Sequence, residues 1–98
     1  MLFDPNIIDT CTNLISTKEF FNKYKDKGGI YLIKYLDNDY IYYIGRAKIF
    51  KHRLKMHLKP NNRSKLHLFA NLVGWDKFSF SIIEICNLNV QKERENYY

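Results

Sequence analysis

The sequence predicts a single α/β domain in which a small three-stranded antiparallel sheet is flanked by helices. Two runs rich in Ile, Leu and Tyr, 30–36 and 40–44, lie on either side of the polar segment 37–39. This pattern is typical of a β-hairpin. A third apolar run, 78–85, follows two segments with helical periodicity, and a chain of 98 residues has room for one core.

Residues 1–27 are predicted to be an N-terminal extension with one short helix. The segment 16–19 (Ser-Thr-Lys-Glu) has the form of a capping box, and aromatic residues follow at near-helical spacing as far as Tyr24. The glycine pair 28–29 ends this helix. The remaining residues, 28–98, are predicted to form the main domain.

Two helices are expected between the hairpin and the third strand, and another after it. The first helix repeats an apolar residue every four positions, at Phe50, Leu54 and Leu58. Ser64 is placed to cap the second helix, and Gly74 is placed to end it. The last helix is predicted to follow the third strand and to run to the end of the sequence.

Positive charge is concentrated in one part of the sequence. The net charge is +6 at pH 7, and the segment 40–75 contains no Asp or Glu. Cations without counter-charges over two helices favour contact with phosphates, whereas a solvated basic face is the alternative interpretation. We therefore predict double-stranded DNA as the partner. The predicted DNA-contacting residues are Arg46, Lys48, Lys51, Lys55, Lys59, Arg63 and Lys65.

Several other classes of protein are disfavoured by composition. Cys11 and Cys86 lie far apart and show no metal-ligand spacing, so neither a disulfide framework nor a zinc site is indicated. No apolar run approaches the ~20 residues that span a bilayer. The first residues also lack the basic region of a signal peptide. We expect a monomer that has no contact with a membrane.

Four polar side chains are predicted to meet between the hairpin and the first basic helix. Tyr31 and Tyr43 share one face of a hairpin whose register is centred near Asn38. Arg53 and His57 are one helical turn apart and border the apolar stripe, so they should point toward the sheet. A structural ion pair, a satisfied histidine and packing tyrosines are the alternative to a functional site.

The order and spacing of these residues resemble the signature of the GIY-YIG endonuclease family. Each tripeptide alone is common, but the ordered set is specific, and the likeness covers about residues 28–98. The two tripeptides are separated by residues 32–42 between their tyrosines. The matching residues are Gly29-Ile30-Tyr31, Tyr43-Ile44-Gly45, Arg53 and His57.

A glutamate near the end of the sequence extends the resemblance. The segment 93–98 (Glu-Arg-Glu-Asn-Tyr-Tyr) resembles the last helix of the family, in which a glutamate binds the catalytic metal. Glu95 is the best match, and Glu93 is the alternative. The resemblance therefore implies a divalent metal ion, Mg²⁺ or Mn²⁺, held at Glu95.

The reaction that the resemblance implies is the hydrolysis of a DNA phosphodiester bond. Arg53 would hold the scissile phosphate and stabilise its charge in the transition state. Tyr31 or Tyr43 would activate the attacking water with help from His57. Because a phenol has a pKa of about 10, Arg53 and the metal are expected to lower that value. The glycines of the signature are expected to let the DNA backbone approach closely.

Two departures from the family pattern concern His67 and the end of the chain. Some family members carry another catalytic histidine or tyrosine after the first helix. His67 lies slightly late for that position, and exposure to solvent on the second helix is the alternative to a direct role. Because the sequence ends at Tyr98, the last helix is expected to be cut short, which is consistent with a fragment or a minimal domain.

The predicted function is that of a metal-dependent DNA endonuclease, the catalytic domain of an intron-encoded homing endonuclease. The segment 74–78 also resembles the region before the third strand in homing members. The alternatives are a DNA-binding module that has lost catalysis, a structure-specific repair or recombination nuclease, and a protein-interaction domain. The abundance of Ile, Asn and Lys suits an AT-rich genome. We expect a mitochondrial, organelle-encoded origin, with a phage or the bacterial cytoplasm as alternatives.

Overall fold

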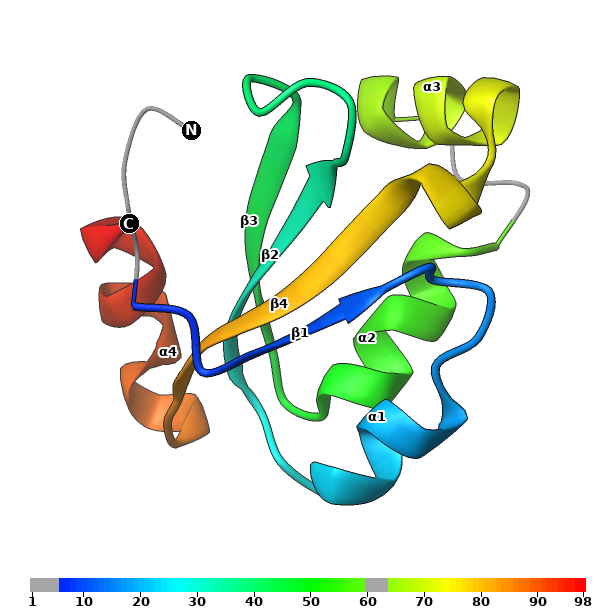
Figure 1. Ribbon diagram of the computed structural model, residues 1–98. Coiled ribbons are helices and arrows are strands. Elements are labelled where there is room, and N and C mark those ends of the chain that lie inside the picture. The colour runs from blue at the N-terminus through cyan, green and yellow to red at the C-terminus, as the bar shows by residue number, and fades with distance from the viewer. Residues whose placement is uncertain (1–5, 60–63) are drawn as a thin grey trace.

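A four-stranded antiparallel sheet with helices on both faces forms the part of the chain that the computed structural model describes, residues 6–59 and 64–98 (Figure 1). The strand order is β1-β4-β2-β3. The predicted α/β class is confirmed, whereas the predicted number of three strands is wrong. The strands are β1 (Asp9–Thr12), β2 (Gly29–Tyr35), β3 (Tyr42–Ala47) and β4 (Phe78–Ile85).

The additional strand, β1, comes from the segment predicted as an extension. Its four residues are mostly polar, and only Cys11 is buried, so the strand has too little alternation to be recognised in the sequence. It pairs with β4, and the hydroxyl groups of Thr10 and Ser81 lie 2.9 Å apart across the pair. This pairing covers an edge of β4 that would otherwise be open. The boundary between an extension and a main domain at residue 27 stays a prediction.

The helices divide between the two faces of the sheet (Figure 1). Ser64 accepts a hydrogen bond from the His67 backbone at the start of one helix, and Gly74 ends it, as predicted. The predicted capping box is absent, because Thr17 makes no capping bond through its side chain. None of the described helices is long and apolar enough to cross a membrane. The helices are α1 (Lys18–Lys23), α2 (Phe50–His57), α3 (Lys65–Val73) and α4 (Leu88–Tyr97).

Alternation along β2 sends its side chains into two separate apolar clusters. Tyr31 and Ile33 belong to the larger cluster, which includes side chains of α1, α2 and α3. Ile30 and Leu32 belong to the smaller one, on the side of α4. The ring of Phe80 stacks on that of Tyr31, with centroids 5.0 Å apart and planes 13° apart. Packing in the larger cluster therefore fixes the position of the Tyr31 ring.

A β-bulge interrupts the pairing of β2 with β4. Ile30 pairs with Glu84 and Tyr31 pairs with Ile82, so Ile83 is an extra residue in β4. Paired residues project to the same face of a sheet. The bulge therefore turns Glu84 to the face of Ile30, where α4 lies, and away from the larger cluster that contains Ile82.

Candidate active site

The hairpin of β2 and β3 brings the two predicted tyrosines together. Tyr31 pairs with Gly45 and Ile33 pairs with Tyr43, which confirms the predicted register and the shared face. The ring centroids of Tyr31 and Tyr43 are 6.1 Å apart. Their exposure differs: Tyr31 is 1% exposed and Tyr43 is 41% exposed. Tyr43 is therefore the phenol that solvent or a substrate meets first.

Gly45 leaves the space that the phenol of Tyr31 occupies. A Cβ atom at Gly45 would lie 2.5 Å from Oη of Tyr31 and 2.8 Å from a ring carbon of Tyr43. At Gly29, where φ is +153°, a Cβ atom would lie 2.0 Å from the carbonyl oxygen of Glu84. Both glycines were predicted to admit the DNA backbone. In the structure, close contacts within the protein already require them.

A chain of hydrogen bonds runs from the sheet to α3 through two histidines. Tyr31 Oη lies 2.6 Å from His57 Nε2, and His57 Nδ1 lies 2.7 Å from His67 Nε2. Ser64 Oγ then bonds Nδ1 of His67. His67 is 4% exposed, and its ring is parallel to that of His57, with centroids 4.9 Å apart. The ring of Trp75 lies on it at a tilt, with centroids 5.8 Å apart. The alternative in which His67 faces solvent is therefore wrong.

Burial favours the neutral form of both histidines in this hydrogen-bond network. Burial lowers the pKa of His57 to about 4, with smaller effects from His67 and Arg53. Burial also lowers the pKa of His67. A neutral imidazole donates through one nitrogen and accepts through the other. In the three hydrogen bonds from Tyr31 to Ser64, each residue can therefore donate to the next one along the path. All three donors and acceptors can also be exchanged together.

The pKa of Tyr31 is raised, which contradicts the prediction that its surroundings lower it. Burial is the main cause, and the neighbouring phenol of Tyr43 adds to it. Arg53 acts in the predicted direction but is outweighed by burial. Tyr31 is thus a neutral phenol whose proton can leave only if an acceptor takes it. His57 is that acceptor by position.

Arg53 lies beside the two tyrosines. No ion pair with Arg53 is found among residues 6–59 and 64–98, so the alternative of a structural ion pair has no support there. Its side chain lines a shallow pocket of about 250 Å³ together with Tyr43, His57 and His67. A guanidinium group in such a pocket matches the geometry of a phosphate.

Glu95 and Glu93, the two candidate metal ligands on α4, differ in their exposure. The carboxylate of Glu95 is near enough to Tyr31 to raise its pKa. Glu95 is half-buried and Glu93 is exposed. In the described ranges, no group of three or more His, Cys, Asp or Glu side chains could hold a metal. One carboxylate suits Mg²⁺, which keeps most of its waters, but does not suit zinc.

The predicted basic face is exposed along β3 and α2. The apolar stripe of α2 is buried at Phe50 and Leu54, and the lysines lie away from it, as predicted. Arg63 lies outside the described residues. The contact of this face with DNA stays a prediction. The exposed members are Arg46, Lys48, Lys51, Lys55, Lys59 and Lys65.

The sheet, the paired tyrosines and the adjacent Arg–His helix define a nuclease-like site, and comparison with known proteins identifies the class. Residues 27–98 match the family model of the GIY-YIG catalytic domain. The chain therefore belongs to the GIY-YIG family of nucleases. The predicted resemblance is confirmed.

One similar protein comes from a bacterium. UvrABC system protein C of Desulfitobacterium hafniense (strain Y51) is 31% identical over 68 residues, which are 69% of this chain and 11% of that protein. The chain thus spans a small part of the length of this relative. No solved structure matches the chain.

Proposed function

We propose that this chain is a DNA endonuclease domain that hydrolyses phosphodiester bonds with one divalent metal ion. The observation that carries the proposal is the position of Arg53, which has no ion pair within the described residues, close to a buried phenol. That phenol is Tyr31, which is bonded to His57 at 2.6 Å. Arg53 can bind a phosphate, and the Tyr31–His57 pair beside it can accept a proton. Membership of a nuclease family supports this interpretation.

The phosphate is proposed to bind in the pocket at Arg53. The five N–H donors of its guanidinium group can bond two phosphate oxygens at once. Because Arg53 is half-buried and has no ion pair in the described part of the chain, its charge is available to a ligand. The same donors then stabilise the negative charge that grows on the phosphate in the transition state.

Glu95 is proposed to hold the divalent ion, Mg²⁺ or Mn²⁺. When bound, such an ion stabilises the developing charge on the leaving oxygen. The carboxylate of Glu95 is half-buried and near enough to Tyr31 to raise its pKa, whereas Glu93 is exposed. A single carboxylate with water ligands is typical of Mg²⁺ sites that also use substrate phosphates.

Tyr31 is proposed as the group that takes the proton of the attacking water, because it is the tyrosine bonded to His57. As the water proton reaches Oη of Tyr31, the phenolic proton passes to Nε2 of His57. The proton on Nδ1 of His57 passes to His67, and that on Nδ1 of His67 passes to Ser64. Ser64 is exposed, so its hydroxyl proton can leave to solvent.

This transfer leaves the four residues of the proton path, from Tyr31 to Ser64, neutral. A charged imidazolium would be unfavourable here, since burial already lowers the pKa of His57 and of His67. Movement of protons along preformed bonds therefore explains how a phenol with a raised pKa can still act on water. The ring centroids of Tyr43 and His57 are 5.3 Å apart. Tyr43 also lines the pocket, where it can orient the phosphate.

Nicking of supercoiled plasmid DNA in Mg²⁺ tests the proposal. Arg53→Ala and Glu95→Ala are each expected to lower the rate about 10²–10³-fold, since each removes a stabilising contact of the transition state. Arg46→Ala is the matched control, because Arg46 is an exposed arginine outside the pocket. Its rate at saturating protein should stay close to that of the wild type. Equal cutting by all four proteins would refute the assignment.

The wider context is proposed to be that of an intron-encoded homing endonuclease of mitochondrial origin. Its support is the likeness of segment 74–78 to homing members and the Ile-, Asn- and Lys-rich composition. A structure-specific repair or recombination nuclease is the second candidate. Cleavage of linear and branched duplexes of the same sequence separates the two, because only a structure-specific enzyme should require the branch.

A further inference from the structure

We propose that Glu84, Arg94 and Tyr98 form a polar clamp that fixes the last turn of α4 and thereby positions Glu95 for metal binding. The inference rests on the proposed function in one respect, namely that Glu95 is the metal ligand. Arg94 and Glu84 are accordingly positioning residues that do not touch the substrate. Neither residue was assigned a role from the sequence, although Arg94 lies in the segment 93–98.

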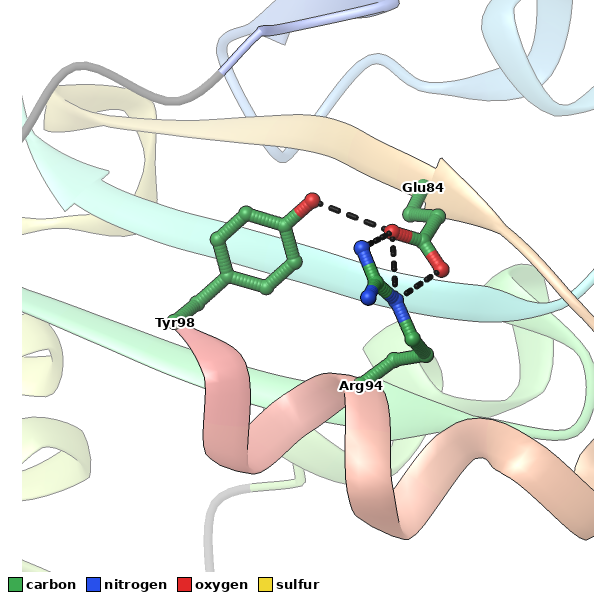
Figure 2. A network of polar contacts seen from close by, with 3 residues as sticks. All are labelled: Glu84, Arg94 and Tyr98. Carbon is green, nitrogen blue, oxygen red and sulfur yellow. Dashed lines mark hydrogen bonds and ion pairs between the residues drawn. The ribbon is translucent and has the colours of Figure 1, made fainter.

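The contacts of the clamp converge on one carboxylate (Figure 2). Nε of Arg94 donates to both oxygens of Glu84, at 2.9 and 2.7 Å, and Nη2 of Arg94 donates to Oε1 at 2.6 Å. The hydroxyl group of Tyr98 donates to the same Oε1 at 3.1 Å. Arg94 and Tyr98 are four residues apart, so they lie on one face of α4. The planar guanidinium group therefore fixes both the position and the rotation of the helix.

α4 depends on such contacts because it has no apolar stripe to bury. Its aliphatic residues are largely exposed, Leu88 at 60% and Val90 at 37%. The residue that it buries is instead Gln91, which is 2% exposed and donates through Nε2 to the carbonyl oxygen of Cys86 at 3.1 Å. A helix normally gains most of its stability from packing an apolar face. Here polar contacts take over much of that role.

The β-bulge in β4 is the feature that makes the clamp possible. If β4 alternated regularly with no bulge, Glu84 would share the face of Phe80 and Ile82 and point toward the larger apolar cluster. The bulge turns Glu84 toward α4 instead. Bulges commonly redirect one side chain in this way near functional sites. A carboxylate on a mostly buried strand is thus explained by its partner on the helix.

The position of Glu95 follows from that of Arg94. Successive residues of a helix are separated by about 100° around its axis. With Arg94 directed at Glu84 on the sheet, Glu93 falls on the exposed side and Glu95 on the opposite side, near Tyr31. Because Glu95 lies in the last turn, where helices fray most easily, loss of the clamp should free this turn first.

The clamp is tested with Arg94→Ala, with Lys92→Ala as the matched control. Lys92 is an exposed basic residue of the same helix. The Mn²⁺ dissociation constant is measured by water-proton relaxation, and amide exchange is measured over residues 95–98. Arg94→Ala should raise the dissociation constant about tenfold or more, as is typical when a group that orients a metal ligand is lost. It should also speed exchange in 95–98, whereas Lys92→Ala should change neither.

Further variants separate a positioning role from general instability. Arg94→Lys keeps the positive charge but loses the planar guanidinium group that bonds both oxygens of Glu84. The Mn²⁺ affinity of this variant should therefore lie between those of the wild type and Arg94→Ala. Tyr98→Phe removes the weakest contact and should have the smallest effect. If Arg94→Ala lowers the melting temperature of the whole domain, these two milder variants decide the question. Unchanged Mn²⁺ affinity in all the clamp variants overturns the inference.

The outcomes also separate the clamp from the proposed function. A wild type that binds Mn²⁺ through Glu95 without cutting DNA refutes the endonuclease activity, while the clamp is still judged by the Mn²⁺ affinity of Arg94→Ala. If the Glu95→Ala variant binds Mn²⁺ as well as the wild type does, the clamp's role in metal binding is refuted. If the wild type also cuts DNA in that case, the endonuclease activity is supported, but its metal ligand is a residue other than Glu95.

Discussion

Gly45→Ala is expected to damage the site through a steric clash at Tyr31. The added methyl group would lie 2.5 Å from Oη of Tyr31, so the phenol must retreat by about 0.9 Å to reach the 3.4 Å of an ordinary contact. The opposite side of its ring is closed by Phe80, whose ring stacks at 5.0 Å. The backbone or the phenol must therefore shift within a packed core, which typically lowers stability by about 1–3 kcal/mol.

The same shift should have a larger effect on the reaction than on the fold. Tyr31 is bonded to His57 at 2.6 Å, and a displacement of about 0.9 Å would lengthen this bond beyond useful range or break it. A misplacement of about 1 Å in a catalytic group can lower the rate about 100-fold. We therefore expect a loss of that order in the first-order rate of plasmid nicking, at saturating protein and Mg²⁺.

The neighbouring residue Arg46 provides the control for this substitution. Arg46→Ala changes the next position of β3, but its side chain is exposed and lies outside the pocket. It should weaken DNA binding and its salt dependence while leaving the nicking rate at saturation unchanged. Gly45→Ala protein that melts as the wild type does and nicks DNA at the same rate would refute the reasoning about Tyr31. Lower stability with an unchanged rate would show that the position of the phenol does not matter.

Three further predictions concern protons and metal. Tyr31→Phe should lower the nicking rate about 10²–10⁴-fold, more than Tyr43→Phe does, because the proton path begins at Tyr31; similar losses would refute that path. The pKa of His57 is lowered on folding from 6.5 to about 4, so the unfolded chain binds more protons between these values. The free energy of unfolding should therefore fall as pH decreases from 6.5 toward 4, and less so in His57→Asn; equal slopes in urea titrations would contradict this. EDTA should abolish nicking but not salt-sensitive DNA binding in a gel-shift assay, and Mn²⁺ should restore nicking.

Local signals predicted the part of the site that local structure builds. The apolar and polar pattern of the hairpin gave its register, and a four-residue repeat gave the buried face of α2. Ser64 as a helix cap and Gly74 as a helix end follow from the backbone chemistry of single residues. These features depend on neighbours within a few positions, which is the range over which a sequence pattern carries information.

The features that the sequence did not predict depend on contacts between distant segments. β1 is short and polar, and it becomes a strand because β4 offers it an edge. His67 is buried because α3 packs toward His57 and Trp75, although its spacing from Ser64, three positions away, was a visible sign of a local bond. The net pKa shift of Tyr31 was also mispredicted, since charge can be read from a sequence but depth of burial cannot.

The two halves of the site are held by different forces because they come from elements that pack against opposite faces of one sheet. The half with Tyr31 and His57 is fixed by the larger apolar cluster, whereas Glu95 depends on the ion pair of Arg94 with Glu84. Salt screens a half-buried ion pair in part but hardly weakens an apolar core. Rising salt should therefore raise the Mg²⁺ requirement for nicking before it lowers the melting temperature. Arg94→Ala should remove most of this effect, because in that variant no clamp is left for salt to weaken.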